Sequence, residues 1–537
     1  MSTDLQHAIF QHAFRVLKLQ NGVFAPSFRY APPTVDLNLP VVFNRNLGRN
    51  PETFVRFQCL IAQYMLPKLL SEIKHENLVN LTRRVVDPDI ADTCDRCLWS
   101  FFSASWMCSG CGWDICPACM QQRQNGREDI SLACDQACKS YEYIPVSRFS
   151  PDELSRMIEE TQAISAKPAP SFSVSRSRVA SFVGLGLQGK VFRIPTTDLS
   201  TALFECLWDE YRFPFVATGL VLQGQYGPGW FGCREVSKQP CKVDNEDGTS
   251  ENMTIGEYFE QTKFGSSLAG APMKKVRDYP PQEEFVSNKV LSSLCADIFS
   301  NVPAPDITRL DGCLNAAASF PVGIAKSDLG PKLYIATRDE KNQGSTKWHM
   351  DVADAWNALL FGTAALWHIV AAKDAPALRR FMRNHLDMME AQGDPIIQQK
   401  TYFSQELLTE FQQSSGVSVF EIVQKPGEIV FIPAGCPHQC IKTRIDCIKI
   451  ASDFVHPRSF NACEAVAEGF RVENLVEIEG WQADVLQIGR TVRYAYKVLH
   501  DNEEKLEQIS SMRESQAQTS CGSNGTLRVS LVSNSFL

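Results

Sequence analysis

The chain has 537 residues, and at roughly 100–200 residues per domain this length predicts about three folded units and excludes a single small domain. Hydrophobic residues make up 44% and charged residues 21%, an ordinary globular composition that excludes a largely disordered or collagen-like protein. The formal net charge of −8 at pH 7 repels a phosphate backbone, so it excludes nucleic-acid binding by bulk charge and leaves only local contacts.

Neither a secretory signal nor a membrane span is predicted from the sequence. The N-terminal sequence MSTDLQHAIFQHAF lacks the basic flank and apolar run of a secretory signal. The longest apolar stretch, residues 357–372, is shorter than the roughly 20 residues that a membrane span needs. We therefore expect a soluble intracellular protein with no membrane contact.

Changes in composition divide the chain into six segments. Helical spacing of Phe54, Phe57, Ile61 and Tyr64 predicts one helix in an otherwise Pro-rich first segment. A stretch rich in Pro and Ser, AKPAPSFSVSRSRVAS, is typical of a linker. The predicted order is an N-terminal region (1–90), a Cys-rich zinc module (91–145), a linker (146–182), a large β-rich domain (183–460), a helical C-terminal region (461–509) and a disordered tail (510–537).

The second segment is dense in cysteine. Of the 19 cysteines in the chain, eight form CxxC or CxxxC pairs within one short stretch: Cys94, Cys97, Cys108, Cys111, Cys116, Cys119, Cys134 and Cys138. Two such pairs complete one tetrahedral Zn²⁺ shell, so eight cysteines predict two structural zinc ions. We expect a cross-brace in which the first pair shares one ion with the third, and the second pair shares the other ion with the fourth. Disulfides are disfavoured in a reducing compartment.

Short β-like runs broken by Gly and Pro fill the large domain, among them PFVATGLVLQG, KLYIAT, EIVFIP and CIKIASDFV. Two helices are predicted between them, one beginning at Asp374 with Pro376 in its first turn and one from Ser404 to near Gly416. Many short strands with helical insertions predict a mainly β fold, a double-stranded jelly roll like that of cupins.

A metal-ligand pattern lies within this domain. His349 and Asp351 are two residues apart, so in a strand both side chains point to the same face. His438 follows the apolar run EIVFI and a Pro/Gly turn, in the frame GEIVFIPAGCPH. Two histidines and one carboxylate leave three positions of a metal open, as in non-haem Fe(II) oxygenases. An isolated HxD is more often a polar pair at a strand end, but the joint order and context favour metal. His368 and His385 are expected to be packed structural residues.

Several segments carry a resemblance to a known family. DYPPQEEF, TKWHMDVADAWN, ALWHIVAAKD and KPGEIVFIPAGCPHQCIKTRIDCIKIASDFVHP resemble the JmjC catalytic domain of the lysine demethylase 3 family, and the cysteine cluster resembles that family's zinc finger. The resemblance implies a nuclear oxygenase that uses Fe(II), 2-oxoglutarate and O₂ to remove methyl groups from histone lysine, mainly mono- and dimethylated lysine 9 of histone H3. It implies that His349, Asp351 and His438 bind the iron.

One departure from JmjC domains concerns the cosubstrate. Many of them hold the far carboxylate of 2-oxoglutarate with a lysine about sixteen residues after HxD, but no cation stands near Ala365 here. Lys449, on an otherwise apolar strand, is our first choice for this anchor, because a buried ammonium needs an anion. We expect hydrogen bonds to 2-oxoglutarate from Thr346 and Asn357, and we expect Tyr334 to line the methyl-lysine pocket. A purely structural hydrogen bond is the competing interpretation for each of these residues.

The sequence thus predicts a histone demethylase of the nucleus that regulates transcription and acts on methylated histone tails or nucleosomes, with transcription coregulators as possible partners. Two alternatives stay open. One is a JmjC hydroxylase that oxidises a carbon atom of a non-histone side chain. The other is a chromatin scaffold or ubiquitin ligase built on the zinc module, with Trp99, Phe101, Phe102 and Trp106 as an exposed apolar patch.

Overall fold

The computed structural model describes residues 15–20, 23–28, 51–84, 92–110, 112–125, 142–167, 174, 176–210, 212–266, 270–280, 288–321, 327–339, 346–442, 446–476 and 484–500. The tail predicted to be disordered (510–537) and the predicted zinc ligands Cys111, Cys134 and Cys138 lie outside these residues. Within the described ranges, no helix has the length and apolar character required to cross a membrane.

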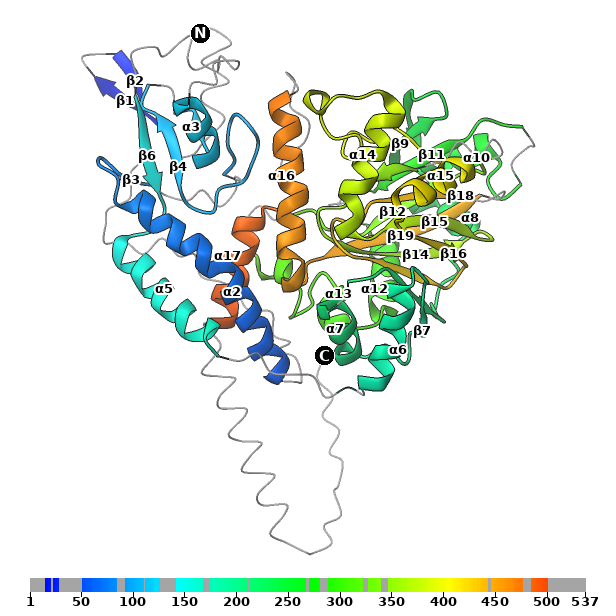
Figure 1. The fold of residues 1–537 in the computed structure, drawn as a ribbon. Helices are drawn as coiled ribbons and strands as arrows, with labels where there is room; N and C mark the ends of the chain where they lie inside the picture. The colour runs from blue at the N-terminus through cyan, green and yellow to red at the C-terminus, as the bar shows by residue number, and fades with distance from the viewer. Residues whose placement is uncertain are drawn as a thin grey trace, which may run out of the picture.

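Eight antiparallel strands form a jelly roll on one side of the molecule (Figure 1). One sheet has the order β12-β19-β14-β17 and the other β13-β18-β15-β16. These strands are β12 (Lys332–Ala336), β13 (Thr346–His349), β14 (Asp354–Phe361), β15 (Ala365–Val370), β16 (Val419–Gln424), β17 (Ile429–Ile432), β18 (His438–Lys442) and β19 (Cys447–Phe454). Strands from both halves of the domain pair across each sheet, as in a double-stranded β-helix. The predicted fold class is confirmed.

The larger sheet extends beyond the jelly roll to nine strands. The additional strands are β11 (Lys274–Tyr279), β9 (Pro240–Asn245) and β10 (Ser250–Thr254) beside β12, and β8 (Phe215–Thr218) and β7 (Arg193–Pro195) beside β17. Helix α7 (Thr201–Glu210) packs on this sheet through aromatic side chains, with Phe204 and Trp208 in contact with Phe215, Phe431 and Phe454. These buried rings fix the larger sheet from its outer face. Further helices of this domain are α6 (Arg176–Leu187), α10 (Ile255–Thr262), α12 (Lys289–Asn301) and α13 (Pro305–Thr308).

The two helices predicted between the strands are present. Helix α14 (Ala375–Leu386) begins after Asp374, and α15 (Gln405–Ser415) has the Ser404 side chain as its N-cap and Gly416, at φ +69°, as its C-cap. A left-handed C-cap favours glycine because it has no Cβ. Both helices pack with Trp348 and Phe403 in a separate apolar cluster over the smaller sheet.

The predicted linker differs from the structure. Residues 143–147 form β6 (Tyr143–Ser147), and residues 151–165 form helix α5 (Pro151–Ser165), which begins with a capping box between Ser150 and Glu153. Leu154, Ile158 and Ile164 are buried on one face of this helix. The Pro- and Ser-rich composition is therefore confined to the stretch after α5, and an amphipathic helix precedes it.

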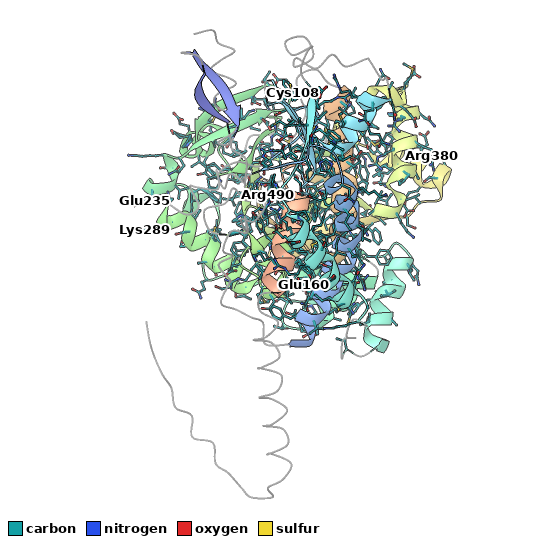
Figure 2. All side chains as sticks on the ribbon, turned by 90° about the vertical axis from the view of Figure 1, so that its left-hand side faces the viewer. Cys108, Glu160, Glu235, Lys289, Arg380 and Arg490 are labelled. Atoms are coloured by element: carbon teal, nitrogen blue, oxygen red, sulfur yellow. The ribbon has the colours of Figure 1, made fainter. Side chains whose placement is uncertain are left out.

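The N-terminal and C-terminal helices form one packed body beside the jelly roll. Helix α2 (Pro51–Glu76) is longer than predicted and continues through Pro67. It packs against α5 and against α17 (Ile488–His500), while Tyr64 donates a hydrogen bond of 2.7 Å to Glu464 on α16 (Phe460–Val476). Figure 1 shows α16 and α17 between α2 and the jelly roll. In Figure 2, Cys108 lies at the upper side of this body and Glu160 of α5 at the lower side.

One buried acid in α2 gives a stability prediction. Glu72 is 6% exposed, and burial raises its pKa from 4.5 to about 7. The folded state then binds a proton that the unfolded state releases, so stability falls as pH rises from 4.5 through 7, by about 3 kcal/mol at most. Glutamine stays neutral at every pH. We therefore expect Glu72→Gln to raise the melting temperature when it is measured above pH 7, and to change it little at about pH 5. The exposed Glu159→Gln is the control, and an equal effect of Glu72→Gln at both pH values would contradict this role of Glu72.

Candidate active site

Three side chains with metal-binding atoms meet between the two sheets of the jelly roll. One ligand atom each from His349, Asp351 and His438 lies within 4.8 Å of the others. His349 ends β13 and His438 begins β18, and the two residues face each other in the antiparallel register. An oxygen of Asp351 lies 4.0 Å from His349 Nε2, and the other lies 3.6 Å from His438 Nε2. Strand pairing therefore brings together residues that lie far apart in the sequence.

The two imidazoles are oriented by the backbone. His349 Nδ1 donates to the Lys347 carbonyl and His438 Nδ1 to the Cys436 carbonyl, each at 2.9 Å. Because a carbonyl oxygen only accepts, both rings carry their proton on Nδ1 and leave the Nε2 lone pair free toward Asp351. Burial, with the neighbouring His438 ring, lowers the pKa of His349 to about 4, so its imidazole is neutral at physiological pH. Two imidazoles and one carboxylate fit a divalent metal.

A cavity of about 370 Å³ opens beside these three residues. The four other residues predicted for the site, Thr346, Asn357, Lys449 and Tyr334, all line it. They come from β13, β14, β19 and β12, so both sheets of the jelly roll contribute. The structure thus places all the predicted iron ligands and cosubstrate residues around one space.

Lys449 lies at the inner wall of this cavity. It is 3% exposed, and its Nζ lies 2.8 Å from Cys440 Sγ and 4.1 Å from the centre of the Trp367 ring. Among the described residues, no carboxylate forms an ion pair with it. A buried ammonium held only by a thiol and a ring face is poorly compensated, so it favours an anionic ligand.

The side chains of the other three predicted residues differ in the hydrogen bonds that they already make within the protein. Asn357 is 8% exposed, and its Oδ1 is buried without a hydrogen-bond partner in the described part of the chain. Thr346 Oγ1 accepts a hydrogen bond of 3.0 Å from Lys275 Nζ. The Tyr334 hydroxyl donates to Asp278 Oδ1 at 3.0 Å. Asn357 therefore has the most free hydrogen-bonding capacity for a ligand.

Sequence reasoning missed several residues that line the cavity. Asp453 was detectable, because it lies four residues after Lys449 on β19 and so shares its face. Lys275 and Asp278 lie on β11, and Phe470 and Val485 come from the C-terminal region. No local pattern in the sequence signals that these distant segments reach the site.

The zinc module contains a second group of metal-binding atoms. The thiols of Cys94, Cys97, Cys116 and Cys119 lie within 4.8 Å of one another and are buried. Cys116 caps α3 (Pro117–Gln124), and the surrounding sheet has the order β3-β6-β4-β5, with β3 (Thr82–Arg83), β4 (Ser105–Cys108) and β5 (Asp114–Ile115). The first and third cysteine pairs thus meet, as the cross-brace predicts. Of the four cysteines predicted to bind the other zinc ion, the structure describes only Cys108, which is buried.

The aromatic residues of this module are not an exposed patch. Phe101 is 2% exposed, and Trp99 and Trp106 are partly buried against the cysteine cluster. Phe102 packs against Phe149. The module uses these rings for its own core, as a small domain must.

The two histidines expected to be structural lie apart from the metal-binding group. His368 is 2% exposed, and its Nδ1 lies 3.1 Å from Gln439 Nε2, which agrees with a structural role. His385 lies on α14, where its ring contacts Phe403, but the residue is exposed rather than packed in the core.

Comparisons with known proteins match the jelly roll and extend beyond it. A family model described as JmjC domain, hydroxylase matches residues 339–454. Lysine-specific demethylase 3A of Gallus gallus is 32% identical over 332 residues, which cover 51% of this chain and 24% of that protein. Residues 339–454 of this chain therefore form a JmjC domain, and about half of the chain is similar to lysine demethylase 3 proteins. Lysine-specific demethylase 3A of Homo sapiens is 32% identical over 318 residues (50% of this chain, 23% of that protein), and lysine-specific demethylase 3 of Drosophila melanogaster is 29% identical over 317 (49% and 36%).

The JmjC match covers the three metal-binding side chains but not the whole site. His349, Asp351 and His438 fall inside residues 339–454, as does Lys449, while Tyr334 lies outside. The chain spans about a quarter of the length of the two 3A relatives.

Proposed function

We propose that this JmjC protein is an Fe(II)- and 2-oxoglutarate-dependent oxygenase that demethylates histone lysine. The observation that carries the proposal is the position of His349, Asp351 and His438 on one wall of a cavity whose inner end holds the buried ammonium of Lys449. Two imidazoles and a carboxylate bind a metal on one side and leave its other positions open toward the cavity. The donor set therefore fits the iron that JmjC chemistry requires.

Each residue has a distinct task in this mechanism. Lys449 pairs with the far carboxylate of 2-oxoglutarate, and Asn357 and Thr346 orient the cosubstrate by hydrogen bonds. The backbone carbonyls of Lys347 and Cys436 keep Nε2 of both histidines directed at the metal. When bound, iron, 2-oxoglutarate and O₂ would together supply the oxidation of an N-methyl group, which would leave as formaldehyde while 2-oxoglutarate is converted to succinate and CO₂.

The relatives motivate the choice of substrate. They are named lysine-specific demethylases, which supports methylated lysine as the substrate. The choice of mono- and dimethylated lysine 9 of histone H3 follows from the resemblance of the sequence to the lysine demethylase 3 family. Action in the nucleus on histone tails or nucleosomes, regulation of transcription and coregulator partners are part of the same proposal. One structural zinc ion would be held by Cys94, Cys97, Cys116 and Cys119. A second would be held by the other four predicted ligands, Cys108, Cys111, Cys134 and Cys138.

A second candidate is a JmjC protein hydroxylase, which the description of the matching family model favours. It needs the same three ligands, so only the product distinguishes it from a demethylase. A ubiquitin ligase or chromatin scaffold built on the zinc module has less support, because Phe101 is buried and Trp99 and Trp106 are partly buried.

The role of Lys449 gives a direct prediction. A buried charge-assisted contact contributes about 1.5–3 kcal/mol, so we expect Lys449→Ala to raise the half-saturating 2-oxoglutarate concentration by roughly one to two orders of magnitude. Titration of 2-oxoglutarate against turnover measures this, and calorimetry of metal binding tests that the iron site is retained. The control is Lys425→Ala at an exposed lysine. Equal half-saturation in Lys449→Ala and the parent would exclude Lys449 as the anchor.

A further inference from the structure

Strand β19 carries opposite charges at the two ends of the cavity wall. Lys449, Ala451 and Asp453 alternate with residues of the opposite face, and all three line the cavity. At about 3.3 Å per residue, the Cα atoms of Lys449 and Asp453 are about 13 Å apart. The ammonium at one end suits an anionic cosubstrate, so the carboxylate at the other end is available to a different group.

Small residues lie on both sides of Asp453, one on strand β14 and one in the segment before β12. Ala355 on β14 faces it directly in the register. On the other side the Asp453 N–H donates to the Leu329 carbonyl, and the next residue, Gly330, lines the cavity at φ +84°. A Cβ at Gly330 would lie 3.1 Å from Lys332 N, so a larger residue is disfavoured there. The cavity wall beside the carboxylate is therefore formed by residues with little or no side chain.

The Asp453 carboxylate has little compensation in the described part of the chain. No described side chain forms a hydrogen bond or ion pair with it. Lys332 attracts the carboxylate electrostatically, but its Nζ is ion-paired with Asp328 at 3.0 Å. A poorly compensated carboxylate on the wall of a cavity favours a cationic ligand.

We propose that Asp453 accepts an N–H hydrogen bond from the methylammonium group of the substrate and so selects lower methylation states. The inference rests on the proposed demethylase function. Monomethyl- and dimethyl-lysine carry N–H donors when charged, and trimethyl-lysine carries none. Trimethyl-lysine keeps the Coulomb attraction to Asp453 but loses the charge-assisted hydrogen bond, which is the stronger and directional part.

The test compares the full-length protein and its variants on histone H3 tail peptides with mono-, di- or trimethylated lysine 9. Formaldehyde release gives kcat and KM, and calorimetry without iron gives the peptide Kd. Because one charge-assisted hydrogen bond is at stake, we expect the parent to prefer dimethyl over trimethyl peptide by roughly tenfold or more in kcat/KM. Asp453→Asn should abolish most of this preference, mainly by raising KM and Kd for the dimethyl peptide, and Asp453→Glu should restore part of it. Asp311→Asn, at an exposed acid, is the matched control.

The outcomes separate the inference from the proposed function. The role of Asp453 is wrong if the parent demethylates dimethyl and trimethyl peptides with the same kcat/KM. It is also wrong if Asp453→Asn leaves the ratio of these two kcat/KM values unchanged. Either result leaves the proposed demethylase function standing. No formaldehyde from any peptide would overturn both. If Asp453→Asn does not fold, Ala355→Val tests the same part of the cavity, because Ala355 faces Asp453 on the neighbouring strand. The added methyl groups should lower kcat/KM more for the dimethyl peptide than for the monomethyl peptide. Equal loss on both peptides would then contradict the inference.

Discussion

Replacing His349 or Asp351 by alanine is expected to abolish formaldehyde release from methylated histone peptides. Each change removes one of three protein ligands from an open metal site, and the remaining two donors do not hold a divalent cation firmly. His438→Ala should have the same effect, because its Nε2 faces the same carboxylate. The fold should persist, since the side chains lie at strand ends beside the cavity and outside the main apolar clusters.

The measurement pairs turnover with metal content. Iron binding by calorimetry should be lost together with activity, while the melting midpoint changes little. His385→Ala, at an exposed histidine of α14, is the matched control and should keep both activity and iron. Unchanged turnover in the double variant of His349 and Asp351 would show that the metal is held elsewhere.

Removal of zinc has the second large expected effect. Structural zinc contributes about 10–16 kcal/mol of apparent binding free energy in small domains, so loss of ligands unfolds them. We expect either of two double variants to unfold the zinc module. One combines Cys97→Ser with Cys116→Ser, and the other combines Cys108→Ser with Cys111→Ser. The unfolding should spread to α16, because Asn474 donates a hydrogen bond of 3.0 Å to the Cys97 carbonyl.

Elemental analysis measures the metal content of the module. Protein purified without chelators should contain two zinc ions in addition to the catalytic metal, and each double cysteine variant should lose at least one. Cys233→Ser, at a cysteine outside the module, should keep both. Parent protein without zinc would contradict the assignment of all eight cysteines.

The jelly roll and the grouping of His349, Asp351 and His438 could be predicted because their signals are local. The HxD spacing keeps Asp351 close to His349, although β13 ends at His349 and Asp351 lies two residues beyond it, and the run EIVFI followed by a Pro/Gly turn leads to His438 at the start of β18. The caps at Ser404 and Gly416 fixed helix α15 in the same way. In each case a few neighbouring residues determine the structure.

Other features were missed, one through misleading local composition and others because they depend on contacts between distant segments. Helix α5 has a clear apolar face, but the neighbouring Pro- and Ser-rich stretch made the whole segment resemble a linker. Asp278 and Phe470 reach the cavity only because β11 and α16 pack beside the jelly roll. No periodicity records such packing, since it arises from how whole elements fit together.

Mass spectrometry tests the proposed demethylation most directly, on histone H3 tail peptides with dimethylated lysine 9 incubated with the protein, Fe(II), 2-oxoglutarate and ascorbate. We expect successive loss of one methyl group per turnover with release of formaldehyde and succinate, and no such loss with the double variant of His349 and Asp351. A peptide that keeps its methyl groups and gains an oxygen atom, or that is unchanged while a control demethylase acts on it, would contradict the proposed function.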